Sequence, residues 1–261
     1  MSDLDRRQFL EASALGAASL GLTGGLVGCS GQETAAEGVI IDTNVDILGW
    51  PFRELKYGAI PDLVSKLRRH KVKEAWAGSY EALFHKDIDA VNERLARACA
   101  DQGDGLLVPF GAVNPAWPDW EEDLRRVDEV YGMPGIKLYP SYQNYSLGDS
   151  TVEELIRRAT ERGLIVIITV DMEDERVQHP RLDISAADPM PLTEILPEIP
   201  DARVLLANAF RHVRFDELKA ITEQTEVLFD IARLDGAGGL EEALIFRSEE
   251  RRVGKECIVK C

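Results

Sequence analysis

Short runs of apolar and β-branched residues return along the chain at intervals of roughly thirty residues, and this repeat restricts the fold more than any other feature. Each run is continuously apolar instead of alternating between apolar and polar residues, which is typical of a parallel strand buried on both faces. The sequence therefore predicts seven strands, over residues 39–42, 73–77, 106–113, 135–139, 164–170, 203–208 and 226–232.

Between these runs, apolar residues recur with the 3.6-residue period of an amphipathic helix, as in residues 60–67, 88–98 and 152–159. The expected helix ends are N-caps at Asp87, Asp119 and Thr151, and a C-terminal glycine at Gly163. Strands that alternate with helices pair in parallel through right-handed crossovers. An open doubly wound sheet is the alternative to a barrel, but no Gly-x-Gly-x-x-Gly turn follows any run.

The order of elements predicts a (β/α)8 barrel that is truncated before or at strand eight, because a last helix and strand would begin only near Gly239. The composition limits the partners of such a domain. Its 46 acidic and 30 basic residues give a formal net charge of −16, without a basic stripe, so nucleic acid is not expected as a partner. Cys99 falls on the apolar face of a predicted helix and is expected to be a small core residue.

In a barrel of this kind, reactive side chains lie at the carboxyl ends of the strands. Side chains at those positions are Asn44, Asp46, Trp50, Arg53, Asn114, Lys137, Tyr139, Asp171, Glu173, Asp174, His179, Asn208, Arg211, His212, Asp230 and Arg233. Lys137 is the strongest candidate, because Ile136 and Leu138 on either side of it would face the helices and leave it pointing into the barrel mouth. There it can act as a base, a nucleophile or a cationic clamp for a carboxylate. A structural pairing of Lys137 with Asp46 or Asp230 is an equal alternative.

Several motifs resemble the amidohydrolase superfamily, in its amidohydrolase-related branch. They are Asp42-Thr43-Asn44-Val45-Asp46 where that family has Asp-x-His-x-His, Gly135-Ile136-Lys137-Leu138-Tyr139-Pro140, the His179-Pro180 loop, and Val204-Leu205-Leu206-Ala207-Asn208. The resemblance implies a barrel of the metal-dependent hydrolase type. It also implies metal ligands from two histidines after strand one, one after strand five, one after strand six and an aspartate after strand eight, with a strand-four lysine that sometimes bridges two metals.

In this chain the matching positions do not hold histidine. They are Asn44 and Asp46, then Thr169 or Val170, then Asn208. Only Asp46 is a good ligand for a hard metal, whereas catalytic zinc takes three protein ligands. The sequence therefore favours no metal over one divalent metal.

These residues together predict an acid–base group of Lys137, Asp46 and Tyr139. The expected substrate-binding residues are Asn44, Asn208, Arg211, His179 and Asp230. The expected function is hydrolysis of a small carboxylated, lactone or amide substrate. The alternative is a non-catalytic, lipid-anchored barrel that binds a ligand.

The two ends of the chain are interpreted apart from the fold. Asp5-Arg6-Arg7-Gln8-Phe9-Leu10 and Leu26-Val27-Gly28-Cys29 resemble a twin-arginine export signal and a lipobox, which implies a leader over 1–28 and lipidation of Cys29. The expected location is periplasmic and membrane-anchored, with a tether over 29–38 and the barrel domain over 39–246. Residues 247–257 resemble a translated sequencing adapter, so 247–261 is interpreted as foreign to the natural protein.

Overall fold

The computed structural model describes residues 39–224 and 227–232. The predicted leader, Cys29, the tether, the expected eighth repeat and the adapter-like tail lie outside these residues. The described part begins at the first predicted strand and extends through the seventh. Within it, no helix is long and apolar enough to span a lipid bilayer.

All seven predicted strands form, and every neighbouring pair is parallel. The third divides into β3 and β4 at Phe110, whose N–H donates to the carbonyl of Ala77, next to Pro109, which has no N–H to donate. Hydrogen bonds order the strands as β1-β2-β3 and β4-β5-β6-β7-β8. Their bounds are β1 Ile40–Ile47, β2 Val72–Ser79, β3 Leu107–Pro109, β4 Gly111–Ala112, β5 Gly135–Leu138, β6 Ile165–Thr169, β7 Arg203–Ala207 and β8 Val227–Phe229.

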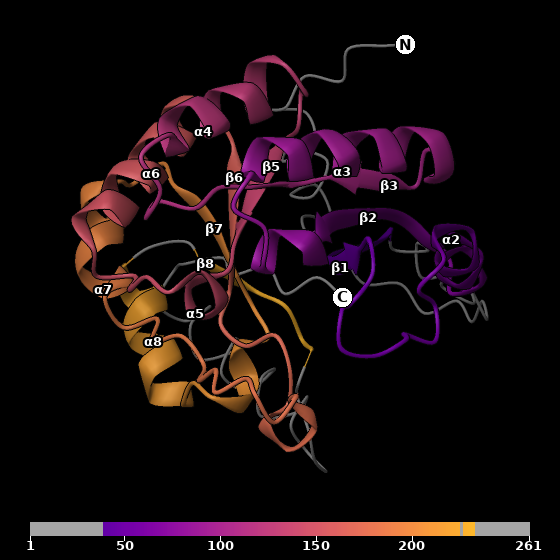
Figure 1. The fold of residues 1–261 in the computed structure, drawn as a ribbon. Coiled ribbons are helices and arrows are strands. Elements are labelled where there is room, and N and C mark those ends of the chain that lie inside the picture. Colours follow the sequence, from indigo (N-terminus) through magenta and orange to yellow (C-terminus); the bar gives the residue numbers. More distant parts are fainter. Residues whose placement is uncertain (1–38, 225–226, 233–261) are drawn as a thin grey trace, which may run out of the picture. The chain divides into compact units, whose positions relative to one another are not determined.

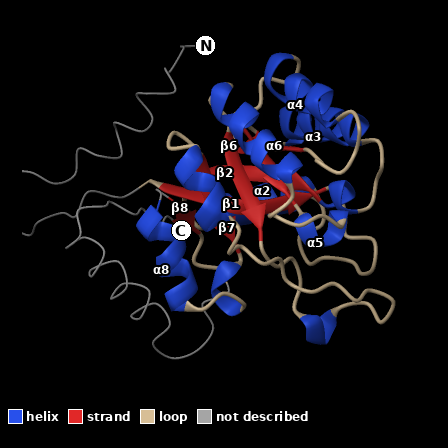
Figure 2. Cartoon of the chain, turned by 90° about the vertical axis from the view of Figure 1, so that its left-hand side faces the viewer, coloured by secondary structure: helices blue, strands red, loops and turns tan. Residues whose placement is uncertain are grey.

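The α-helices follow the strands in the predicted alternation. Their bounds are α2 Ile60–Arg69, α3 Ile88–Gln102, α4 Trp120–Glu129, α5 Pro140–Gln143, α6 Ser150–Glu161, α7 Leu192–Ile195 and α8 Phe215–Gln224. Short 3-10 helices are η1 Tyr80–Leu83, η2 Glu175–Val177, η3 Leu196–Glu198 and η4 Ala209–Arg211. Figure 1 shows α4, α6, α7 and α8 flanking the strands β5 to β8, and Figure 2 shows the strands enclosed by helices.

The predicted helix ends were correct in part. The Asp87 carboxylate accepts a hydrogen bond of 3.0 Å from the N–H of Ala90, so it caps α3. Asp119 occupies the N-cap position of α4 without a side-chain hydrogen bond. The prediction for Thr151 was wrong, because α6 already begins at Ser150 after the N-cap Asp149. Gly163 follows α6 with a φ of +68°, a conformation that glycine adopts at little cost.

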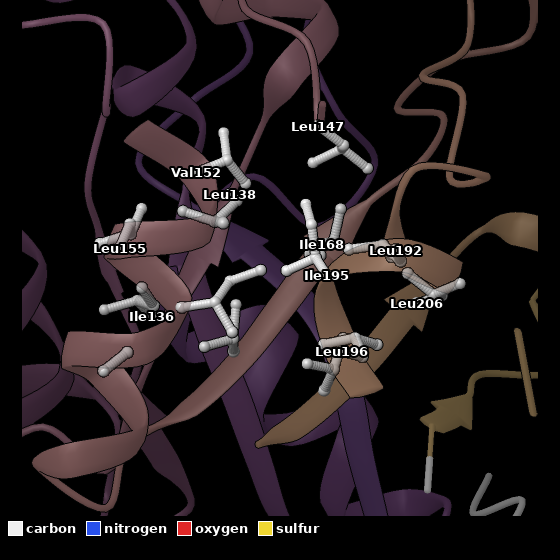
Figure 3. Close-up of a cluster of buried hydrophobic side chains, with 14 of the residues drawn as sticks. Ile136, Leu138, Leu147, Val152, Leu155, Ile168, Leu192, Ile195, Leu196 and Leu206 are labelled. Carbon is white, nitrogen blue, oxygen red and sulfur yellow. The ribbon is translucent and has the colours of Figure 1, made fainter. Parts of the chain in front are cut away.

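Apolar side chains pack against both faces of the sheet, under the helices on the outer face and inside the barrel on the inner face. On the outer face, Ile136 and Leu138 of β5 pack with residues of α6 and α7 (Figure 3). On the inner face, Ile41, Trp76, Phe110, Ile167 and Leu205 form one buried cluster. Because this cluster joins side chains of β1 and β2 to those of β6 and β7, the sheet curls around a packed interior, as in a barrel. Cys99, in α3, is buried and free, as predicted.

Candidate active site

An irregularity in β1 determines the direction of the side chains of Asn44 and Asp46. β1 was predicted to end at Asp42 but continues to Ile47. Its register against β2 shifts between Asp42 and Val45. Such a bulge changes which side chains face each side of a sheet. Beyond it Val45 and Ile47 pack with the apolar residues of α2, and Asn44 and Asp46 contact groups from other strands of the barrel.

Lys137 lies between the two outward-facing residues of β5 and is directed into the barrel. Its ammonium donates a hydrogen bond of 2.8 Å to the carbonyl of Val45 and lies 3.6 Å from Asp46 Oδ1. The hydroxyl of Tyr139 donates to the same Asp46 oxygen at 2.8 Å. The lysine and aspartate side chains are 1% and 5% exposed, so this is a buried ion pair. The structure therefore brings Lys137, Asp46 and Tyr139 together at the carboxyl ends of β1 and β5.

Burial determines the protonation state of Tyr139, and close packing determines the space that the three side chains occupy. Burial, followed by the charge of Asp46, raises the pKa of Tyr139 well above its ordinary value. The phenol therefore stays protonated at neutral pH and serves as a hydrogen-bond donor. Gly78 of β2 lies against the group, because a Cβ there would come within 2.5 Å of the Tyr139 hydroxyl and 2.6 Å of Lys137 Cδ. A side chain at position 78 would occupy the space that the group fills.

Asn44, Asn208 and Asp230 form a second cluster beside the first. The amide nitrogen of Asn44 donates to Asn208 Oδ1 at 2.9 Å and to Asp230 Oδ2 at 2.7 Å. Asn208 has a φ of +58°, and its backbone N–H donates to Asp230 Oδ1 at 3.0 Å. Asparagine tolerates this left-handed conformation better than most residues. Burial raises the pKa of Asp230 to about 6, although hydrogen bonds and the charge of Lys137 oppose the shift.

Two further pairs of polar side chains adjoin these clusters, and both were only shortlisted from the sequence. Asp171 Oδ2 lies 3.0 Å from Nε2 of His212, and the backbone carbonyl of Asp171 accepts a 2.6 Å hydrogen bond from the amide of Asn208. Arg53 Nη1 lies 2.5 Å from Oε1 of Glu173, a side chain that is only 4% exposed. These pairs place acidic groups of the loop after β6 at the barrel mouth.

Sequence reasoning missed Tyr80 and Tyr142, which belong to the same region. Burial, then the charge of Asp46, raises the pKa of Tyr80 far above its ordinary value. Burial and the charges of Glu173 and Asp171 raise the pKa of Tyr142 to about 12. Tyr80 follows β2 directly and Tyr142 lies in α5 just after β5. The rule that reactive residues follow barrel strands could therefore have found both.

The other two predicted substrate-binding residues lie in the segments that follow β7 and β6 and have partners there. Arg211 Nη1 lies 2.8 Å from Asp174 Oδ2. The ring of His179 stacks on Phe52 with centroids 4.9 Å apart. Together with the Arg53–Glu173 pair, the His179–Phe52 stack joins the loop after β1 to the loop after β6.

The described residues do not fit the divalent metal that the family resemblance implies. Asn44 and Asn208 are hydrogen-bonded to each other, and Asp46 faces the ammonium of Lys137, which would repel a second cation. Across the described residues, no three His, Cys, Asp or Glu side chains are grouped so that they could hold a metal.

Comparison with known proteins decides the family. Residues 60–209 match the model of the family described as amidohydrolase, which is more than half of the chain. The chain belongs to the amidohydrolase family. No curated protein matches its sequence.

Solved structures agree with this barrel at low sequence identity. A probable 2-pyrone-4,6-dicarboxylic acid hydrolase from Acinetobacter baumannii, with citric acid bound, is 12% identical with a TM-score of 0.53, over 81% of this chain and 79% of that one. A 5-carboxyvanillate decarboxylase from Novosphingobium aromaticivorans, with bound manganese, is 13% identical with a TM-score of 0.54, over 82% and 85%. A 2,6-dihydroxybenzoate decarboxylase from Rhizobium is 12% identical with a TM-score of 0.51, over 79% and 84%. The amidohydrolase barrel therefore shares its fold with these proteins.

Proposed function

We propose that this member of the amidohydrolase family hydrolyses a small carboxylated ester, lactone or amide with an acid–base group of side chains. The observation that carries the proposal is the buried contact of Lys137, Asp46 and Tyr139 at the carboxyl ends of β1 and β5. Structural neighbours that are named for acting on small carboxylic acids support the substrate class.

The three side chains suit the charge that develops during hydrolysis. Attack on a carbonyl carbon places negative charge on its oxygen, and preorganised donors in a water-poor site stabilise that charge. The Lys137 ammonium is such a donor and carries a full positive charge. Asp46 holds the ammonium and the Tyr139 phenol in place, because one of its oxygens contacts both. Asn44, Asn208 and Asp230 would bind polar groups of the substrate beside them.

The test is a panel of small esters, lactones and amides, with and without a carboxylate, that includes 2-pyrone-4,6-dicarboxylate. We expect the wild type to hydrolyse at least one carboxylated member, and Lys137→Ala to lose at least about a hundredfold in kcat, as for removal of an oxyanion donor. Asp46→Asn should also lower kcat, because it removes the carboxylate that holds the ammonium and the phenol in place. Lys219→Ala is the control, because this lysine is 51% exposed on α8. Full activity of both site variants would refute the assignment. Release of CO₂ from 5-carboxyvanillate would instead assign decarboxylation.

A non-catalytic barrel that binds a ligand is the second candidate. The observation that favours it is that Asn44, Asn208 and Asp230 hydrogen-bond one another, which is typical of a polar core that needs no substrate to satisfy it. Metal analysis and calorimetry with the panel separate the two candidates. Binding of a carboxylic acid without turnover would favour the binding barrel.

We also propose that the chain is exported by the twin-arginine route and anchored through a lipid on Cys29. The support is the pair of N-terminal motifs in the sequence. Fusion of residues 1–38 to a reporter tests the export, with Arg6→Lys and Arg7→Lys together as the control. Incorporation of labelled palmitate that is lost in Cys29→Ala tests the anchor. A cytoplasmic reporter would refute the proposal.

A further inference from the structure

A small polar cavity lies between the ends of β5 and β6, beside the acid–base group. Its volume is about 10 Å³. This is roughly the space that one water molecule needs, and such a water usually has two to four polar partners. The polar side chains of its lining are Tyr139, Ser141, Tyr142, Thr169, Asp171 and Ser185. The cavity is therefore suited to one water molecule next to Tyr139, a member of the proposed catalytic group.

The hydroxyl of Tyr142 gives independent evidence for a ligand in this cavity. It is buried, and no described residue hydrogen-bonds to it. A buried hydroxyl without a partner costs free energy, so such groups are usually satisfied by an ordered water. Burial, followed by the charges of Glu173 and Asp171, raises the pKa of this phenol to about 12, so the hydroxyl stays protonated. Tyr142 therefore offers a donor to whatever occupies the cavity.

Asp171 supplies a base at the same cavity. Its side chain is 7% exposed, and its Oδ2 lies 3.0 Å from Nε2 of His212. Its Oδ1 accepts a hydrogen bond of 3.3 Å from the backbone N–H of Glu173. These two contacts hold the Asp171 carboxylate in one orientation at the cavity, where a carboxylate can accept a proton from a bound water.

We propose that this cavity binds the water that attacks the substrate, with Asp171 as its general base, Tyr142 as the donor that orients it and His212 as a positioning residue. The inference rests on the proposed hydrolytic function. The water oxygen forms a bond to the acyl carbon while one of its protons passes to the Asp171 carboxylate. The bond from the acyl carbon to the leaving oxygen or nitrogen then breaks, and the leaving atom takes that proton. The products are an acid and an alcohol or amine, and Asp171 returns to its charged form.

A crystal structure of the wild type tests the site without any assay of activity. We expect one ordered water within hydrogen-bonding distance, about 2.6–3.2 Å, of the Tyr142 hydroxyl and of an Asp171 oxygen. In Tyr142→Phe, which keeps the ring and removes only the hydroxyl, this water should be lost or displaced. A wild-type cavity without water would overturn the proposal.

Kinetics on the substrate found with the panel tests the role of this water. We expect Asp171→Asn to lower kcat by at least about a hundredfold, the usual contribution of a general base, with KM changed less than threefold. Tyr142→Phe should lower kcat by about tenfold. The matched control is Asp183→Asn, an exposed carboxylate of the same loop, which should keep its kcat. Melting temperatures within about 3 °C of the wild type would show that the variants are folded.

The outcomes separate this inference from the proposed function. An active wild type whose Asp171→Asn variant keeps more than a tenth of its kcat would leave the hydrolase standing and overturn the water site. A wild type that is inactive on every panel member would overturn the hydrolase and the nucleophilic role together. In that case, an ordered water at Tyr142 would be a structural water only.

Discussion

Replacement of Lys137 by methionine tests whether its ammonium is the cation that the barrel interior requires. Methionine keeps most of the side-chain length and removes the charge. The variant leaves the Asp46 carboxylate, 5% exposed, without the ammonium that lies 3.6 Å away, and leaves the Val45 carbonyl without its 2.8 Å donor. Removal of one partner of a buried ion pair typically costs about 3–5 kcal/mol. The hydroxyl of Tyr139 still donates to Asp46, so we expect a loss near the lower limit, about 3 kcal/mol.

Thermal and urea unfolding measure this loss. For a domain of this size about 3 kcal/mol corresponds to a fall in Tm of about 6–12 °C. The matched control is Lys219→Met, because Lys219 is 51% exposed and 4.0 Å from Glu223, and exposed pairs contribute less than about 1 kcal/mol. The double variant Lys137→Met with Asp46→Asn should recover part of the loss, since no unpaired carboxylate remains. A Lys137→Met protein as stable as the control would refute the reasoning.

Three further predictions concern the same region. Gly78→Ala should destabilise the fold by about 1–3 kcal/mol in urea unfolding, because its methyl would lie 2.5 Å from the buried hydroxyl of Tyr139. The control Gly148→Ala, whose methyl would have its nearest atoms at 3.6 Å, should be tolerated in the same assay. Asp230 has a pKa of about 6 in the folded state, against about 3.9 when unfolded, so its stabilising contribution is complete below about pH 4 and is lost as the pH rises through 6. Urea unfolding should therefore show the wild type losing up to about 3 kcal/mol relative to Asp230→Asn between pH 4 and 7, and parallel pH profiles would contradict this. Arg53→Met should lower the free energy of unfolding by about 1–2 kcal/mol and speed proteolysis of the loop after β6, because it removes the partner of the buried Glu173. An unchanged cleavage rate would count against the contact between the two loops.

The elements of this fold were predictable because each depends on residues that are close in the chain. A continuously apolar run predicts a buried parallel strand wherever it stands, and seven such runs became the strands of the described barrel. The direction of Lys137 was predictable for the same reason. Once Ile136 and Leu138 face the helices, the pleat of the strand directs the residue between them to the opposite side.

The bulge in β1 was not predictable, because it depends on the register between β1 and β2. The sequence ended the first strand near Asp42, whereas the strand continues to Ile47 with a shift between Asp42 and Val45. A bulge lets one strand change which residues face inward, and nothing in a local pattern of apolar residues records that change. The error at Thr151 is of another kind, because the N-cap is Asp149, two residues earlier, and an apolar period defines the end of a helix only to within a residue or two.

The sequence by itself determined the kinds of elements and their order along the chain. Only the tertiary structure decided which side chains meet. Asn44 and Asp230 are 186 residues apart and lie 2.7 Å from each other, and Asp171 faces His212 across 41 residues. The physical reason is that periodicity reports only which face of an element is buried, whereas contacts between side chains depend on strand register and on the curvature that brings distant strands around one interior.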